Sequence, residues 1–181
     1  MRHTKRKIIT TTVNTLLEQN GVTEAPINVE HIAKGLGIAI KRAPTDDDIS
    51  GFLLRNADGN IIIGVNALHH PNRQRFTIAH EIGHYMLKHE FDHVHVDRSV
   101  LKLRSGASSS GENQDEVEAN GFAAVLLMPN NFLEHDIEQL TITDLHDDRK
   151  MRQLARRYEV SVQAMTNRLI SLGYLSPGDL V

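Results

Sequence analysis

The sequence predicts an α+β fold, in which a small, mostly antiparallel three-stranded sheet packs on a helical core. The first observation behind this prediction is a cluster of short β-branched and apolar runs between residues 38 and 65. The second is helical periodicity, with recognisable helix ends, on both sides of that cluster. The chain has 181 residues, 40% of them hydrophobic and 24% charged, which is ordinary for a globular protein and sufficient for a sizeable core.

Two helices are expected before the sheet. The first runs from about Lys7 to Gln19 and ends at Asn20-Gly21, a pair typical of helix C-termini. The second is short and covers about Val29 to Gly35. The basic residues at the start of the chain lack the long apolar stretch of a secretion signal, so a solvated terminus is expected there.

Three strand-like runs follow, and we predict that they form the sheet. They cover Ile38–Arg42, Ser50–Arg55 and Asn60–Val65, and Asp58-Gly59 between the last two is typical of a hairpin turn. The consecutive branched side chains of the third run suit a central strand. A sheet that directly precedes the motif helix described next could hold an extended peptide along its edge.

The most informative segment is a predicted helix from about Arg73 to Lys88, which contains the motif His-Glu-x-x-His. Residues four apart lie on one face of a helix, so His80 and His84 can present two imidazoles to one metal ion. Glu81 lies roughly 100° further round the helix axis, where it can accept a proton from an attacking water. The chain has 11 histidines, so a motif this short needs supporting context. That context is a stripe of small and apolar residues that would bury the helix: Phe76, Ile78, Ala79, Ile82, Gly83, Met86 and Leu87.

A catalytic zinc ion needs a third protein ligand and an open position for water. A third histidine at the spacing His-x-x-x-His-x-x-Gly-x-x-His is excluded, because Leu87 and Glu90 occupy the glycine and last histidine positions. A second source is the run His89, His93 and His95, although a ligand so near would require a sharp reversal that nothing in the chain enforces. The third source is a carboxylate on a later helix.

The later helix is predicted over Glu112 to Met128, with an acidic first turn and Pro129 after its end. Within it, we predict Glu116 as the third metal ligand. Asp115 and Glu112 are weaker rivals for that position.

We predict different roles for two residues close to Glu116 on the same helix. Asn120 lies one turn after Glu116 on the same face, so its side chain could hydrogen-bond the outer nitrogen of His80 or His84 and fix its tautomer. Glu118 is offset by about 200° from Glu116. It is therefore expected to be a solvated helix charge that faces away from the metal and takes no part in binding it.

Two blocks of the sequence resemble the ImmA/IrrE family of metallopeptidases. The first runs from Arg73 to Tyr85 and the second from Glu116 to Pro129, and a weaker similarity extends from about Val29 to Leu175. Together the blocks are far more specific than the five-residue zinc motif alone.

This resemblance implies a gluzincin-like site with one zinc ion, in which His80, His84 and Glu116 match the ligands and Glu81 matches the general base. It also implies a cytoplasmic endopeptidase whose typical substrate is a helix-turn-helix repressor of a mobile element or stress response. The segment from His89 to Gly111 is long and rich in histidine, so the substrate groove is expected to differ from that of other members.

Four side chains are candidates to donate a hydrogen bond to the oxyanion of peptide hydrolysis, namely Tyr85, His89, His93 and His95. Tyr85 directly follows His84 on the helix, so packing is its expected role. The Gly/Ser-rich run over residues 103–111 could be a lid or a plain connector between the two metal helices.

Residues 130–181 are predicted to form a helical region packed on a metallopeptidase core of residues 1–129. Helices are expected over Asn130–Leu140, Asp148–Tyr158 and Ser161–Leu172, with Ser161 as N-cap and Gly173 as stop. The last two resemble a helix-turn-helix, which supports a rival hypothesis of DNA binding. In that hypothesis four arginines contact phosphate: Arg152, Arg156, Arg157 and Arg168.

The composition narrows the function further. A net charge of −3 disfavours direct nucleic-acid binding, and no apolar run approaches the length of a transmembrane helix. Cysteine is absent, so a metal must be held by nitrogen and oxygen ligands. The missing targeting signals favour the cytoplasm.

Three functions remain open: a protease acting on a repressor, a toxin-like peptidase neutralised by a partner antitoxin, and a non-catalytic regulator that binds metal and DNA or a partner. A purely structural metal site need not keep Glu81. The intact set of His80, Glu81, His84 and Glu116 therefore favours a peptidase.

Overall fold

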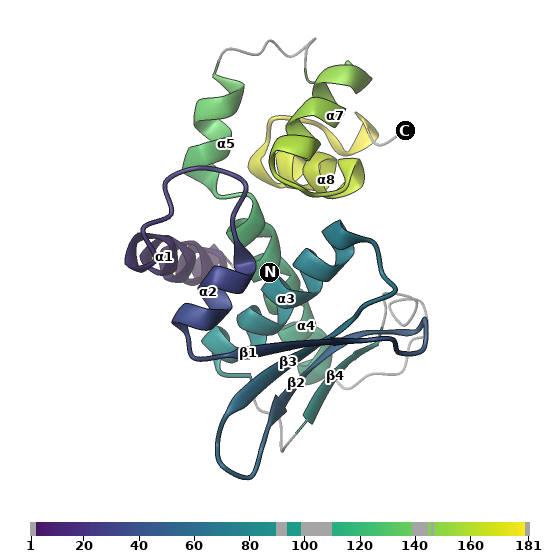
Figure 1. Ribbon diagram of the computed structural model, residues 1–181. Helices are drawn as coiled ribbons and strands as arrows, with labels where there is room; N and C mark the ends of the chain where they lie inside the picture. The colour runs from purple at the N-terminus through teal and green to yellow at the C-terminus, as the bar shows by residue number, and fades with distance from the viewer. Residues whose placement is uncertain (1–2, 90–93, 99–109, 139–144, 146, 180–181) are drawn as a thin grey trace.

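A computed structural model describes residues 3–89, 94–98, 110–138, 145 and 147–179. Figure 1 shows the sheet at one end of the molecule, helices α3 and α4 beside it, and helices α5, α7 and α8 at the opposite end. The elements, in chain order, are α1 (His3–Gln19), α2 (Val29–Gly35), β1 (Ala39–Ala43), β2 (Ile49–Arg55), β3 (Ile61–Asn66), α3 (Pro71–Leu87), β4 (Val94–Arg98), α4 (Ser110–Leu127), α5 (Asn130–Ile137), α7 (Asp148–Arg157), α8 (Val162–Leu172) and the 3₁₀-helix η2 (Pro177–Asp179).

The predicted α+β class is confirmed, and the three predicted strands form the sheet with a fourth strand added. The strand order is β1-β3-β2-β4, in which β1 and β3 are parallel while β2 pairs antiparallel with both β3 and β4. β3 is therefore central, as its branched side chains predict, and Gly59 takes a φ of +83° in the hairpin turn before it. β4 was not predicted, although Val94 and Val96 alternate there with polar residues.

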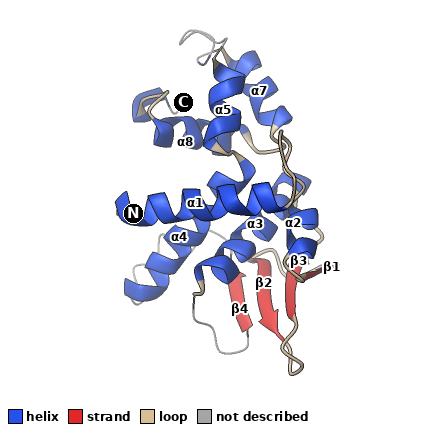
Figure 2. Ribbon diagram, turned by 90° about the vertical axis from the view of Figure 1, so that its left-hand side faces the viewer, coloured by secondary structure: helices blue, strands red, loops and turns tan. Residues whose placement is uncertain are grey.

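α3 packs directly on the sheet, because glycine leaves room for it on β2. A side chain at Gly51 would overlap the methyl group of Thr77 on α3 and the backbone oxygen of Gly64 on β3. Figure 2 shows the strands at the lower end of the molecule, with α3 and α2 next to them. The sheet thus fixes the position of the helix that carries the His-Glu-x-x-His motif.

One continuous apolar core joins the layers. It extends from Ile9 on α1, through Ile63 on β3 and Phe122 on α4, to Tyr158 and Leu169 in the C-terminal helices. All five of these side chains are fully buried. None of the helices among the described residues combines the length and the apolar character that crossing a bilayer requires.

The C-terminal helices begin and end largely where the sequence predicts. Ser161 caps α8 by accepting a hydrogen bond from the Ala164 amide at 3.1 Å, and Gly173 ends it with a φ of +85°. α5 ends at Ile137, and the predicted extension over residues 139–140 lies outside the described residues.

Arg168 is a packing residue and is not available to phosphate. Its guanidinium is buried, donates to the Met128 carbonyl oxygen at 3.1 Å, and also bonds the Asn130 side chain. Burial lowers its pKa to about 10. The prediction that Arg168 would serve a DNA-binding surface is therefore wrong, since it fixes α8 to the junction of α4 and α5.

Candidate metal centre

α3 presents both motif histidines from a stretch of helix that is buried throughout. The helix begins at Pro71, which suits a first helical turn, and the His70 ring caps it by accepting from the Asn72 amide at 3.2 Å. Every residue from Thr77 to His84 is buried, because the sheet covers one side of this stretch and α4 another. The two imidazoles are thereby held in a rigid environment.

The approach of α4 to α3 depends on Gly83, between the two histidines. A Cβ at this position would lie 3.1 Å from Phe122 Cβ and 3.2 Å from both the Cα and the carbonyl oxygen of Ala119. A side chain there would push the two helices apart. The glycine thus allows a residue on α4 to reach the histidines on α3.

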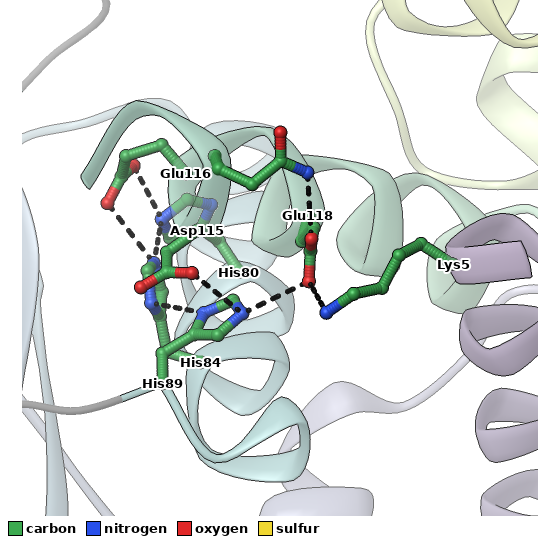
Figure 3. A network of polar contacts seen from close by, with 8 residues as sticks. Lys5, His80, His84, His89, Asp115, Glu116 and Glu118 are labelled. Carbon is green, nitrogen blue, oxygen red and sulfur yellow. Dashed lines mark hydrogen bonds and ion pairs between the residues drawn. The ribbon is translucent and has the colours of Figure 1, made fainter. Parts of the chain in front are cut away.

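That residue is Glu116. His80, His84 and Glu116 each offer one ligand atom, and these atoms all lie within 4.8 Å of one another. The two Nε2 atoms are 3.0 Å apart, and the Glu116 carboxylate oxygens lie 3.4 Å from His80 Nε2 and 3.3 Å from His84 Nε2. Figure 3 shows the carboxylate beside both rings.

These separations suit a tetrahedral metal ion. For metal–ligand distances of about 2.0–2.1 Å, the ligand atoms of a tetrahedral site lie roughly 3.3–3.4 Å apart. The separation of the two Nε2 atoms, and the distance from each of them to an oxygen of Glu116, are close to that value. Two imidazoles with one carboxylate are a typical donor set for zinc. The group could therefore bind a metal ion and leave a fourth position for water.

Asn120 orients the first of the two rings. Its Oδ1 atom lies 3.1 Å from His80 Nδ1, so the predicted contact forms with His80 and not with His84. An amide oxygen accepts hydrogen bonds, which places the hydrogen of His80 on Nδ1 and leaves a lone pair on Nε2. The Nε2 lone pair then faces the centre of the ligand group.

His89 contacts the second ring from behind. Lys88 adopts the left-handed conformation with a φ of 57°, and the His89 amide donates to the His84 carbonyl oxygen at 3.1 Å. This turn brings His89 Nδ1 to 3.0 Å from His84 Nδ1. A sharp reversal therefore does follow α3, contrary to our expectation. It places His89 against the outer nitrogen of His84 and not among the ligand atoms.

Glu118 also lies in surroundings that differ from the prediction. The expected solvated charge is a buried carboxylate, with 2% of its side chain exposed. It accepts hydrogen bonds from Lys5 Nζ at 2.9 Å and from Gln114 Nε2 at 2.8 Å. The offset from Glu116 is as predicted, but α1 packs on the face of α4 to which Glu118 points.

The remaining predicted site residues are placed as follows. Glu81 is fully buried on the turn of α3 between the two histidines. Tyr85 is partly buried and packs against the hydrophobic core. His93 lies outside the described residues, and His95 is placed only by its backbone, which pairs with Leu53.

Asp115, one of the two rival carboxylates, does not join the ligand group. Asp115 lies 3.7 Å from His89 Nε2 and is partly exposed. The side chain of Glu112 lies outside the described part of the chain. Among the described residues, only the His80–His84–Glu116 group gathers three such ligand atoms.

Comparison with known protein families identifies this arrangement. The model of the IrrE N-terminal-like domain, a peptidase family, matches residues 33–170. The match includes α3, α4 and all three residues of the ligand group. The chain belongs to this family. The resemblance to ImmA/IrrE metallopeptidases is thus confirmed.

Two individual proteins are similar to the chain. The radiation response metalloprotease IrrE of Deinococcus radiodurans is 33% identical over 108 residues, which are 58% of this chain and 29% of that protein. A solved structure of a Mycobacterium tuberculosis transcriptional regulator superposes with a TM-score of 0.61 at 18% identity, covering 91% of this chain and 46% of that one. The chain therefore spans less than half the length of each, and the second likeness concerns the fold alone.

Proposed function

We propose that this chain is a zinc-dependent endopeptidase that hydrolyses a peptide bond in a protein substrate. The observation that carries the proposal is the convergence of His80, His84 and Glu116 from two helices, with Glu81 buried beside them. The membership of a metallopeptidase family supports the same reaction class. As the resemblance to ImmA/IrrE metallopeptidases implies, we place this activity in the cytoplasm.

Zinc is the metal that we propose for the site. Two neutral imidazoles and one carboxylate leave a net charge of about +1 on a bound Zn²⁺ and an open coordination position, which is the pattern of catalytic zinc. Zinc held there would polarise the scissile carbonyl and lower the pKa of a coordinated water. Thiolate ligands are excluded because the chain has no cysteine.

Glu81 is the general base in this proposal. It follows His80 directly on α3, so its carboxylate is carried by the same rigid turn as the two ligands. It would accept a proton from the attacking water and pass that proton to the leaving amine. Complete burial of Glu81 restricts competing solvent around it, which strengthens its electrostatic interaction with the reacting groups.

The proposed substrate is a helix-turn-helix repressor of a mobile element or stress response. Support comes from the family resemblance and from the edge position of β4, where an extended substrate segment could pair with the sheet. Direct DNA binding is disfavoured, because Arg168 is buried and Arg157 donates to Asp136 at 2.5 Å. Incubating the zinc-loaded protein with the repressor encoded beside it, and mapping any new termini, tests this substrate.

We also propose that residues 1–129 form the peptidase core and that residues 130–181 are a helical region packed on it. The continuous apolar core supports this arrangement. Polar contacts of side chains in the described residues also cross the boundary, since Arg168 bonds the Met128 carbonyl oxygen and Arg75 on α3 lies 3.0 Å from Glu159.

The sharpest test of the reaction is Glu81→Gln. This variant keeps the volume and removes the base, so we expect normal zinc content, a normal circular dichroism spectrum and loss of cleavage by at least about a hundredfold. Zinc content by atomic absorption and cleavage by mass spectrometry provide the measurements. Retained cleavage would show that Glu81 is not the base.

A further inference from the structure

A chain of polar side chains extends from the metal centre into the protein (Figure 3). His84 Nδ1 lies 3.0 Å from His89 Nδ1, and His89 Nε2 lies 3.6 Å from Glu118 Oε2. Glu118 is in turn bonded to Lys5 Nζ at 2.9 Å. The turn after α3, the middle of α4 and the start of α1 thus meet behind one proposed zinc ligand.

The direction of the hydrogen bonds in this chain is set at Glu118. Its carboxylate accepts hydrogen bonds from Lys5 Nζ at 2.9 Å and from Gln114 Nε2 at 2.8 Å, and the ammonium group of Lys5 forms an ion pair with it. An ionised carboxylate can only accept hydrogen bonds. Whatever faces its remaining lone pairs must therefore be a donor.

The group that faces it is the Nε2 atom of His89. The His89 side chain is 7% exposed, and its Nε2 atom has no partner within hydrogen-bond distance among the described residues. Its nearest charged neighbours are carboxylate oxygens, with Glu118 at 3.6 Å and Asp115 at 3.7 Å. Two acceptors on this side favour a hydrogen on Nε2 of His89, because a lone pair there would be repelled by both.

The position of the hydrogen on His89 determines the tautomer of His84, the proposed metal ligand. A neutral imidazole carries one N–H, so a hydrogen on His89 Nε2 leaves a lone pair on His89 Nδ1. That lone pair accepts from His84 Nδ1, 3.0 Å away. His84 must then keep its own lone pair on Nε2, the atom that lies 3.3 Å from Glu116.

We infer that His89 and Glu118 are positioning residues, which fix His84 in its metal-binding tautomer before a metal ion arrives. This inference rests on the proposed function, since it requires His84 to be a ligand. Asn120 does the same for His80 with a single amide oxygen. His89 and Glu118 touch neither substrate nor metal, and they act only through the ring of His84.

A matched pair of substitutions at His89 tests the inference. His89→Leu removes both ring nitrogens, so we expect the zinc dissociation constant to rise about ten- to hundredfold, as for other lost outer hydrogen bonds to metal ligands. His89→Gln keeps an acceptor for His84 and a donor for Glu118, so we expect it to stay within about threefold of the wild type. His135→Leu, at a site that is 82% exposed on α5, is the control and should not change zinc affinity.

The tautomer of His84 can also be measured directly, and a general loss of stability would not change it. Long-range ¹H–¹⁵N correlation spectra of the metal-free protein distinguish a hydrogen on Nδ1 from one on Nε2. We expect His84 in the wild type and in His89→Gln to carry its hydrogen on Nδ1. In His89→Leu the ring should populate both tautomers.

The outcomes separate the inference from the proposed function. If the wild type binds zinc and His89→Leu binds it equally well with the same tautomer, the positioning role is wrong while the zinc site stands. If the wild type and a His84→Ala variant bind zinc equally, His84 is not a ligand and the proposed site itself is wrong. Should His89→Leu fail to fold, the metal-free wild type still decides, because a hydrogen on His84 Nε2 would overturn the inference.

Discussion

Two glutamates on α4, two residues apart, occupy opposite surroundings. Glu116 is 33% exposed, and its carboxylate faces two imidazole nitrogens. Glu118 is only 2% exposed, and Lys5 and Gln114 bond it directly. The more deeply buried charge is thus not the one in the ligand group.

The difference follows from what each position requires. A catalytic metal ligand must leave access for water and substrate, so partial exposure is compatible with its role. A charge that only orients a neighbour is best removed from solvent and fully hydrogen-bonded, because burial strengthens its electrostatic influence and pairing offsets its desolvation. The exposed face of α4 thus carries the proposed metal ligand, and the buried face carries the residue that orients another ligand.

The largest expected effect comes from Glu116→Ala. Removal of the only carboxylate in the ligand group should weaken zinc binding by well over tenfold. Because the residue is partly exposed, the unfolding free energy of the metal-free protein should change by less than about 0.5 kcal/mol. Chelator competition and urea unfolding of the metal-free protein measure the two quantities.

Equal zinc affinity in Glu116→Ala and the wild type would remove the basis of the comparison. A large loss of stability in the metal-free variant would mean that Glu116 is structural. In the same pair of measurements, Glu118→Ala should show the larger change in stability.

For Glu118→Ala we expect the stability of the metal-free protein to fall by about 1–3 kcal/mol. The substitution leaves a void at the α1–α4 contact and removes the acceptor of Lys5 and Gln114. Lys5 is half exposed and can be hydrated in the variant, which favours the lower part of that range. Chemical unfolding followed by circular dichroism measures the change. Unaltered stability would contradict the claim that the buried Glu118 stabilises the contact between α1 and α4.

Much of the fold was predictable because its signals are local. The helix ends at Gly21 and Gly173, the cap at Ser161 and the i, i+4 spacing of the two histidines are each encoded within a few residues. The prediction of Glu116 needed one further step, because it required two helices to meet. The helical pattern around Gly83 and the acidic face of the later helix supplied that step.

The surroundings of Glu118 could not be predicted in the same way. Helical geometry gives the direction of Glu118 relative to Glu116, but not which element packs on that side. The partner is Lys5, 113 residues earlier in the chain. Long-range packing of this kind leaves no mark on the local pattern of α4, so a buried, paired glutamate and a solvated one have the same sequence signature there.

The position of His89 was missed for a different reason, and this gives the smallest of the expected effects. The reversal after α3 uses the left-handed conformation at Lys88, where glycine is the usual residue. A non-glycine residue in this conformation costs roughly 1 kcal/mol of stability, which a change to glycine would remove. The greater freedom of glycine in the unfolded chain offsets part of this stabilisation. Lys88→Gly should therefore stabilise the metal-free protein by about 0.5 kcal/mol and leave zinc affinity within about twofold, because the amide of His89 can still bond the His84 carbonyl oxygen.

Lys34→Gly is the matched control, because Lys34 lies within the last turn of α2. The same substitution there should destabilise the protein by up to about 1 kcal/mol, since glycine weakens a regular helix. Thermal unfolding of both variants measures the contrast. If both substitutions destabilise the protein to the same extent, Lys88 does not adopt the left-handed conformation and the chain does not reverse there. His89 would then not lie between His84 and Glu118.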